Sequence, residues 1–170
     1  ELLGVGLSGK VLGVVGAGRI GREVARRAVA FDMSVVYWDK VRDEAWEAEA
    51  GAGWRPLDAL LEESDVVSVH VPLTPETRGL IGAKAFERMK PGAIVVNTAR
   101  GPVIDEAALI DALERRRIRG AGLDVYEAEP IIPPRLRALD NVVLLPHLGS
   151  ATEEARRGMW RQAWANLMRG

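Results

Sequence analysis

The sequence predicts an α/β fold, in which helices cover both faces of a doubly wound, six-stranded parallel sheet and form three layers with it. Two observations support this prediction. Six short apolar runs alternate with stretches of helical spacing along the 170 residues, and neighbouring parallel strands need crossover connections of that kind. The first apolar run also leads directly into a glycine-rich turn that opens a helix, which is typical of doubly wound sheets.

The six predicted strands are rich in Val, Ile and Leu, as expected for strands that are buried on both faces. They are Val11 to Gly16, Ser34 to Trp38, Asp65 to Val71, Ala93 to Asn97, Gly120 to Val125 and Val142 to Leu145. Six strands match the full doubly wound fold.

Five stretches between and after these strands have the apolar spacing of helices. They are Arg19 to Phe31, Leu57 to Glu63, Ala83 to Met89, Asp105 to Arg117 and Ala151 to Met168. Ser150-Ala151-Thr152-Glu153 opens the last of them and predicts a capping box, in which a hydroxyl and a carboxylate three residues apart bond the first amides.

The connection over residues 40–56 is predicted to be irregular surface chain. Asp43 to Ala50 has the composition of a helix. Gly51, Gly53 and Pro56 follow at once and would end such a helix early. We therefore expect neither a helix nor a strand of the sheet in this connection.

Composition and charge exclude several classes of function. A net charge of −1 gives no electrostatic reason to bind nucleic acid or an anionic membrane. Because cysteine is absent, the chain has no disulfide framework, thiolate nucleophile or cysteine zinc site. No apolar run reaches the roughly 20 residues that span a bilayer, and no signal peptide is recognisable. A cytoplasmic protein with a single compact domain is expected.

The glycine-rich turn reads Gly16-Ala17-Gly18-Arg19-Ile20-Gly21 and joins a strand to a helix, which is the context that the dinucleotide fingerprint of the Rossmann fold requires. Gly16 permits the tight turn, Gly18 lets the backbone approach a pyrophosphate, and Gly21 lets the helix lie close to the sheet. The N-terminus of the helix stabilises the phosphates. The alternative is an ordinary glycine turn.

Asp39 ends the second predicted strand, 18 residues after Gly21, close to the offset of about 20 expected for the acid that binds the adenosine ribose. Its negative charge repels a 2′-phosphate and therefore favours NAD as the cofactor over NADP. Lys40 and Arg42 lie nearby and argue in the other direction. The alternative is that Asp39 only solvates the end of a strand.

Polar segments follow each of the last three predicted strands, and they contain Arg100, Glu129 and His147. The carboxyl ends of parallel strands meet at one edge of a sheet and form the ligand crevice there. We therefore expect these three side chains to converge, although 29 and 18 residues separate them along the chain. The alternatives, for each residue taken singly, are a surface arginine before a glycine-proline turn, one of several loop acids, and a strand-end histidine.

Across nearly all of its length, the chain resembles the D-isomer-specific 2-hydroxyacid dehydrogenases, a family that includes glyoxylate/hydroxypyruvate reductases and phosphoglycerate dehydrogenases. The glycine turn is one matching motif. The others are HVPLTPET from His70, MKPG from Met89, VNTARG from Val96, GLDVYEAEP from Gly122 and PHLGSAT from Pro146. Together these motifs are highly specific.

By this resemblance, Arg100 binds and polarises the substrate, Glu129 pairs with the histidine, and His147 is the acid and base. Reduction of a 2-keto acid adds a hydride to the carbonyl carbon and a proton to its oxygen, which requires an acid that titrates near neutrality. Glu127 competes with Glu129, but the family acid stands immediately before the proline.

The cofactor is expected to contact residues from the same motifs, and no metal site is expected. The predicted cofactor-binding residues are Gly16, Gly18, Arg19, Ile20, Gly21, Asp39, Val71, Pro72, Thr77, Thr98, Ala99, Arg100, Asp124, His147 and Gly149. Asp124 either tunes the nicotinamide end or bonds the loop backbone. His70 is expected to end the third strand near the cofactor and not to be the proton donor.

Residues 1–170 are expected to form one dinucleotide-binding domain, with most of the family's substrate domain absent. Either the chain is naturally short or it is a piece of a longer one. In isolation we expect it to bind the cofactor and to turn over weakly, because domain closure excludes water from such sites. Glyoxylate and hydroxypyruvate are the first expected substrates, and a homodimer is expected. The alternative function is a noncatalytic module that senses NAD and dimerises.

Overall fold

The structure, a computed structural model, describes residues 4–169 and contains a parallel sheet of seven strands among them. The strands are β1 (Val11–Val15), β2 (Ser34–Trp38), β3 (Gly53–Trp54), β4 (Val66–Val69), β5 (Ile94–Asn97), β6 (Gly120–Leu123) and β7 (Val142–Leu144). Their order in the sheet is β3-β2-β1-β4-β5-β6-β7. The prediction of a doubly wound α/β fold is therefore confirmed. Residues 1–3 and 170 of the predicted domain lie outside the described residues.

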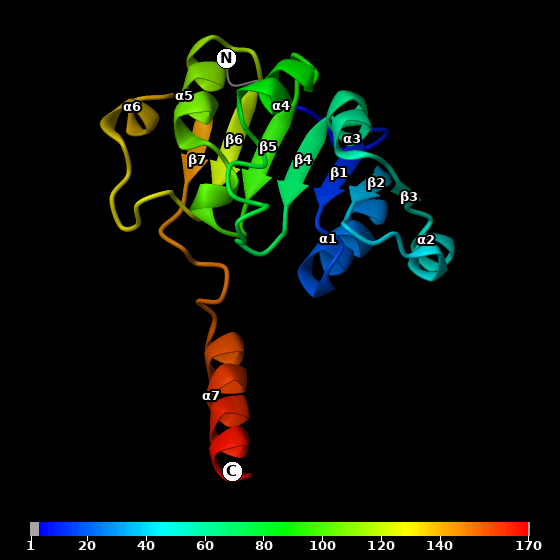
Figure 1. Cartoon of the computed structure of the whole chain (residues 1–170), viewed down its shortest axis with the longest axis vertical. Coiled ribbons are helices and arrows are strands. Elements are labelled where there is room, and N and C mark those ends of the chain that lie inside the picture. The colour runs from blue at the N-terminus through cyan, green and yellow to red at the C-terminus, as the bar shows by residue number, and fades with distance from the viewer. Residues whose placement is uncertain (1–3, 170) are drawn as a thin grey trace.

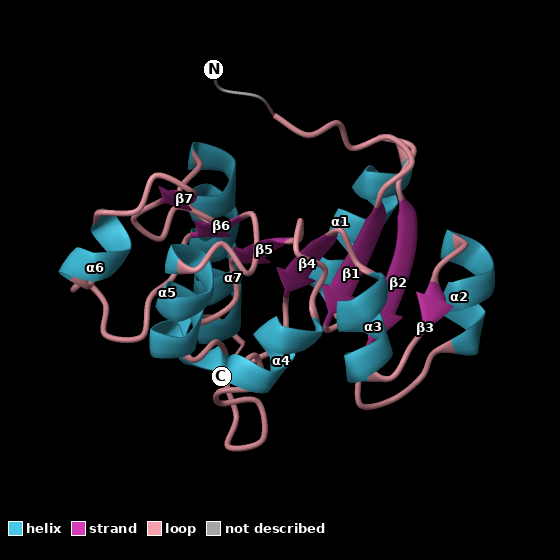
Figure 2. Ribbon diagram, turned by 90° about the horizontal axis from the view of Figure 1, so that it is seen from above, coloured by secondary structure: helices cyan, strands magenta, loops and turns pink. Residues whose placement is uncertain are grey.

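Seven α-helices connect or follow the strands within the described residues. They are α1 (Arg19–Val29), α2 (Glu44–Ala50), α3 (Leu57–Glu63), α4 (Ala83–Arg88), α5 (Glu106–Glu114), α6 (Pro134–Arg137) and α7 (Glu153–Leu167). In Figure 2, α1 lies on one side of the sheet and α3, α4 and α5 lie on the other. The core correspondingly has two clusters, one between α3–α5 and the sheet and one beneath α1.

The prediction of six strands and of an irregular connection over residues 40–56 was wrong, because α2 and β3 lie there. Asp43 caps α2 by accepting a bond of 3.0 Å from the Trp46 amide, and Gly51 ends the helix with a φ of 64°. Trp46 is buried and meets the ring of Tyr37 edge-on at 4.8 Å. The glycine expected to break the element therefore caps it, and the helix is stable because its tryptophan packs into the core.

The side of β5–β7 that faces the same way as α1 is only partly covered. Alternate residues of β5 and β6 are incompletely buried, and Val143 of β7 is 62% exposed. An apolar groove of about 340 Å³ runs between α1 and this part of the sheet, and Phe31 and Val96 line it. The layer formed by α1 is therefore narrower than the layer formed by α3–α5.

Helix α7 projects away from the sheet beyond the edge at which the strands end (Figure 1). None of its 15 residues, all within the described part of the chain, is buried. Thr152 caps it by accepting from the Ala155 amide at 3.2 Å, so the predicted capping box at Ser150 was wrong, and the helix begins two residues later than expected. Among the described helices, none combines the length and the apolar character required to cross a bilayer.

Candidate active site

The glycine-rich turn between β1 and α1 is held by close backbone contacts. Gly16 has a φ of +100°, and a Cβ there would lie 2.7 Å from the amide nitrogen of Val71. A Cβ on Gly21 would lie 2.1 Å from the carbonyl oxygen of Gly16. Neither position has space for a side chain, so the turn, the start of α1 and the segment after β4 pack directly on one another.

The N-terminus of α1 is suited to bind an anion. Gly18 is the N-cap and supplies no side-chain acceptor, and the first turn contains no acidic residue. Its amides therefore lack the partners that usually satisfy them, and the helix dipole adds partial positive charge. Arg19 and Ile20 line an open groove beside Gly18. These features fit the pyrophosphate of a dinucleotide.

Asp39 lies directly after β2 and faces the glycine turn. Its Oδ2 accepts from the Ala17 amide at 2.9 Å and its Oδ1 accepts from the Lys40 amide at 2.7 Å. Each carboxylate oxygen keeps capacity for a further bond, such as one from a ribose hydroxyl. A cavity of about 190 Å³ opens between Asp39, the glycine turn and the segment after β4, and Val71, Pro72 and Thr77 line its far side.

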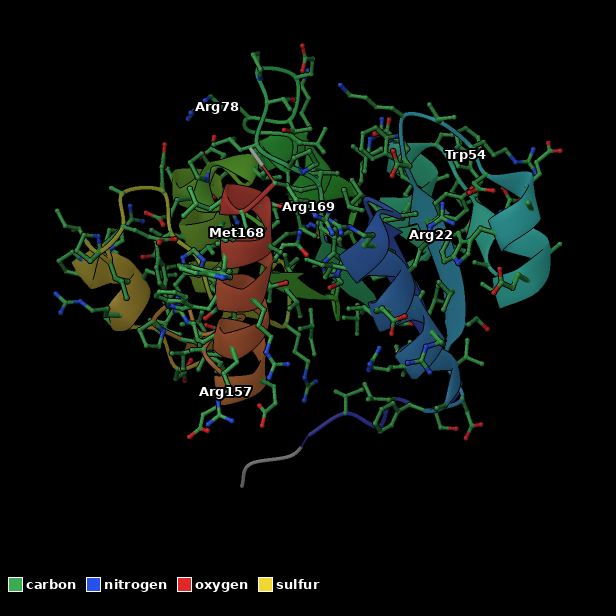
Figure 3. The ribbon with its side chains drawn as sticks, turned by 90° about the horizontal axis from the view of Figure 1, so that it is seen from below. Arg22, Trp54, Arg78, Arg157, Met168 and Arg169 are labelled. Atoms are coloured by element: carbon green, nitrogen blue, oxygen red, sulfur yellow. The ribbon has the colours of Figure 1, made fainter. Side chains whose placement is uncertain are left out.

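Arg22 of α1 braces this turn from the opposite side. Its Nε donates to the Ala17 carbonyl at 2.8 Å, and its Nη2 donates to Asp43 at 2.6 Å. Its guanidinium also lies 5.0 Å from the centre of the Trp46 ring. Figure 3, which looks onto the edge where the strands end, shows Arg22 on the side of α1 that faces α2. The missed helix α2 thus helps to position the turn.

At the other end of the same edge, Glu129 and His147 form a direct pair. The Nδ1 of His147 lies 2.8 Å from the Oε2 of Glu129, and the second carboxylate oxygen accepts from the Tyr126 amide at 3.1 Å. The hydrogen bond to His147 is the main cause that lowers the pKa of Glu129 below its ordinary value, while burial opposes it. Because Nδ1 is engaged by the carboxylate, Nε2 is the ring nitrogen left for other partners.

Asp124 anchors the loop that carries His147. Asp124 is 4% exposed, and its carboxylate accepts from the Leu148 amide at 2.6 Å and from the Gly149 amide at 2.8 Å. His147 has a φ of +57°, a left-handed conformation that a non-glycine residue adopts only when its surroundings impose it. Two roles were predicted for Asp124, and the hydrogen bonds to the loop backbone are the one that the structure contains.

Arg100 follows β5 and lies near the same pair. Its charge contributes to the lowered pKa of Glu129, and its Nη1 donates to the Ala99 carbonyl at 2.6 Å. A Cβ on Gly101 would lie 1.9 Å from the carbonyl carbon of Tyr126, so the loop after β5 packs against the backbone of the Glu129 segment. The structure therefore brings Glu129 and His147 into direct contact and packs the loop that carries Arg100 against the Glu129 segment.

Several residues that shape the site were missed. Asn97 is 1% exposed and bonds both the Ala99 amide at 3.0 Å and the Arg100 carbonyl at 3.1 Å. The Tyr126 hydroxyl donates to the Leu145 carbonyl at 2.7 Å. Thr74 lines the cavity beside Asp39. A polar residue at the end of an apolar strand was the available signal for Asn97.

Thr98 and His70, two other residues that the sequence singled out, line the surfaces beside α1 and Asp39. Thr98 lines the apolar groove beside α1 and not the cavity at Asp39. His70 follows β4 and lines that cavity. Burial lowers the pKa of His70 to about 4. Among the described residues, no group of three or more His, Asp or Glu side chains is placed to hold a metal ion.

Residues 1–149 match the family model described as D-isomer specific 2-hydroxyacid dehydrogenase, NAD binding domain. The chain belongs to this family. Its membership is consistent with the dinucleotide-binding turn and with the carboxylate–histidine pair, which lie at one sheet edge.

Relatives of this 2-hydroxyacid dehydrogenase domain include a protein named glyoxylate reductase from Thermococcus litoralis, 52% identical over 166 residues that make up 98% of this chain and 50% of that protein. The crystal structure of a glyoxylate reductase from Paecilomyes thermophila is 44% identical with a TM-score of 0.93, over 98% of this chain and 51% of that one. A D-lactate dehydrogenase from Aquifex aeolicus, solved with NAD and lactic acid, is 36% identical with a TM-score of 0.90, over 98% and 54%. The chain thus spans about half the length of the relatives it matches.

Proposed function

We propose that this chain is the NAD-binding half of a dehydrogenase that reduces a small 2-keto acid to a 2-hydroxy acid. The observation that carries the proposal is the Glu129–His147 pair at 2.8 Å, at the same sheet edge as the glycine turn. Similarity to proteins named glyoxylate reductase supports glyoxylate and hydroxypyruvate as the first substrates to test, with phosphohydroxypyruvate next.

The cofactor is held, in this proposal, by the turn at Gly16 and Gly18, the N-terminus of α1 and the Asp39 carboxylate. The uncapped first turn of α1 takes the pyrophosphate, and the two oxygens of Asp39 accept from the ribose hydroxyls. Asp39 repels a 2′-phosphate, which favours NAD over NADP. When bound, the nicotinamide supplies the hydride.

His147 supplies the proton. With Nδ1 bonded to Glu129, the Nε2 of the protonated ring donates to the carbonyl oxygen of the keto acid as hydride reaches its carbon, and it takes the proton back in the reverse reaction. Glu129 fixes the orientation of the ring and stabilises its positive charge. Asp124 is a positioning residue, because it holds the backbone that follows His147.

Arg100 binds the substrate. A guanidinium presents parallel donors that match a carboxylate and a neighbouring carbonyl oxygen, and it remains charged throughout the reaction. The next residue, Gly101, packs against the Tyr126 backbone in the segment that leads to Glu129, which supports this role. The Arg100 charge then polarises the carbonyl and holds it next to the proton donor.

The remaining half of the relatives' length is proposed to form the substrate domain, which closes over this edge and covers the apolar side chains of α7. We also propose that the protein is a homodimer. Sizing chromatography of the chain tests this: elution at twice its 18.5 kDa mass is expected, and a single species at 18.5 kDa would contradict it.

The enzymatic proposal is tested on the longest natural protein that contains this chain. Glyoxylate or hydroxypyruvate is added with NADH, and the absorbance of the reduced nicotinamide is followed for the wild type, His147→Gln and the control Glu62→Gln, which removes an exposed carboxylate paired with Arg88. We expect the wild type to oxidise NADH, His147→Gln to lower the rate by about 100-fold or more, and Glu62→Gln to retain the wild-type rate. If the protein binds NADH but no 2-keto acid causes its oxidation, the result would instead favour the noncatalytic NAD-sensing module.

The cofactor preference is tested by titrating the chain with NADH and with NADPH. Asp39→Ala is expected to raise the affinity for NADPH relative to NADH by about tenfold, because one negative charge beside the 2′-phosphate is removed. Asp58→Ala, which removes an exposed carboxylate of α3 that pairs with Arg88, is the control. A ratio that Asp39→Ala leaves unchanged would remove the role proposed for Asp39.

A further inference from the structure

Lys40 is the cation of the cavity at the end of β2. It lines this cavity beside Asp39, with Thr74 and Thr77 on the far side. A free lysine at this position would favour a 2′-phosphate through its charge and so counteract Asp39. Whether Lys40 is free or engaged therefore decides how strongly the cavity discriminates between the two dinucleotides.

Lys40 is engaged by Glu76, which comes from the far side of the cavity. The Lys40 Nζ lies 3.6 Å from the Oε2 of Glu76, and both side chains are exposed. Arg42, the second cation after β2, is engaged as well, since it donates to both carboxylate oxygens of Glu47 at 2.8 and 2.9 Å. Both basic side chains that follow Asp39 thus have carboxylate partners.

The turn that carries Glu76 is held by hydrogen bonds among its own residues. The Thr77 hydroxyl is buried, donates to the Pro72 carbonyl at 2.6 Å and accepts from the Thr74 amide at 2.8 Å. The Thr74 hydroxyl donates to the Oε2 of Glu76 at 2.7 Å, and this bond is the main cause that lowers the pKa of Glu76. Glu76 is therefore an ionised carboxylate that is bonded to Thr74, a residue that lines the cavity.

We propose that Glu76 is a specificity-determining residue, which masks Lys40 and thereby keeps the ribose cavity selective for a dinucleotide without a 2′-phosphate. The inference rests on the proposed function, because it assumes that a dinucleotide binds with its adenosine ribose at Asp39. Asp39 excludes the phosphate by its own charge, whereas Glu76 acts on the cation that would otherwise attract it. Selectivity is then shared between the end of β2 and the turn after β4.

The test measures the dissociation constants of NADH and NADPH for the chain and its variants at low ionic strength. Glu76→Gln keeps the bond to Thr74 but frees Lys40, so it is expected to tighten NADPH binding about fivefold, the size of one exposed charge acting on a phosphate. NADH binding is expected to change less than twofold. Glu62→Gln, which removes an exposed carboxylate paired with Arg88 at 2.8 Å, is the matched control and is expected to leave the ratio unchanged.

A double variant with Glu76→Gln and Lys40→Ala separates masking from simple loss of negative charge. If Glu76 acts by masking, removal of Lys40 cancels most of the gain in NADPH affinity. An unchanged ratio in Glu76→Gln, or a gain that persists without Lys40, would overturn the inference and leave the proposed function intact. A folded chain that binds neither dinucleotide would overturn both.

Discussion

His70 is expected to make the stability of this domain depend on pH from about 6.5 downward, a range that begins above the one in which carboxylates titrate. It lies after β4, with its Nε2 2.8 Å from the hydroxyl of buried Ser68. Burial lowers its pKa from 6.5 to about 4 in the folded chain. As the pH falls through 6.5, the unfolded chain therefore takes up a proton that the folded chain refuses, and folding stability is lost down to about pH 4.

The size of the effect follows from the two pKa values. Linkage between 6.5 and 4 predicts a loss of about 2 kcal/mol in the free energy of unfolding from pH 7 to pH 5, and about 3 kcal/mol by pH 4. His70→Gln removes the titration and keeps an amide nitrogen near the hydroxyl of Ser68. The variant is therefore expected to lose about 2 kcal/mol less than the wild type between pH 7 and pH 5.

Urea denaturation at pH 7 and pH 5 measures this difference. Ser68→Ala is the matched control, because it removes the hydrogen bond but keeps the imidazole, whose pKa is lowered by burial. Ser68→Ala is expected to retain the pH dependence of the wild type. Parallel stability profiles for the wild type and His70→Gln would refute the reasoning, because they would mean that the ring is hydrated well enough to be protonated in the folded state.

Three further substitutions test the packing around the candidate site. Gly101→Ala is expected to lower the free energy of unfolding by at least about 3 kcal/mol in thermal denaturation, because its Cβ would meet the Tyr126 backbone at 1.9 Å. Gly92→Ala is the control, since a Cβ there has no atom within 4 Å, and it is expected to cost less than about 1 kcal/mol. Asp124→Ala is expected to lower the free energy of unfolding by about 3 kcal/mol in urea denaturation, since it leaves two amides without their carboxylate. A loss under about 1 kcal/mol would mean that water replaces the carboxylate as the acceptor. Glu129→Gln is expected to cost less than about 1 kcal/mol by the same measurement, because the His147–Glu129 pair is partly exposed, and a larger loss would assign the pair a structural role.

The sequence predicts the strands well where their signal is local. Six of the seven strands coincide with the predicted runs of apolar or small residues. Parallel strand ends share an edge, which is why Glu129 and His147 meet although 18 residues separate them. β3 has two residues and no periodicity of its own. It exists because Gly53 and Trp54 pair with Val36 and Tyr37 of β2, a contact that no local pattern encodes.

The cap of α7 was predicted wrongly for a different reason, because the chain offers two similar candidates. Ser150 and Thr152 are both good caps, and the segment after β7 decides between them, since Asp124 holds the backbone at Leu148 and Gly149 and α7 starts only at Glu153. The pairing of Lys40 with Glu76 was not predicted from the sequence either. It joins residues 36 positions apart whose pairing depends on the packing of the turn after β4 against the end of β2.

Helix α7 allows a last prediction about how much of this fold is stable in the chain by itself. Its apolar side chains form one stripe, with Trp160, Trp164 and Leu167 at 73%, 55% and 73% exposure. An isolated helix of about 15 residues is marginal in water, and tertiary packing normally stabilises it.

We therefore expect the amides of α7 to exchange with deuterium nearly as fast as an unstructured peptide when the chain is monomeric, whereas amides of the buried strand β4 exchange slowly. In a protein of the relatives' full length, α7 is expected to be protected, because the additional half is proposed to cover its stripe. Protection of α7 equal to that of β4 in the monomeric chain would contradict this reasoning, since it would require a stable helix without a packing partner.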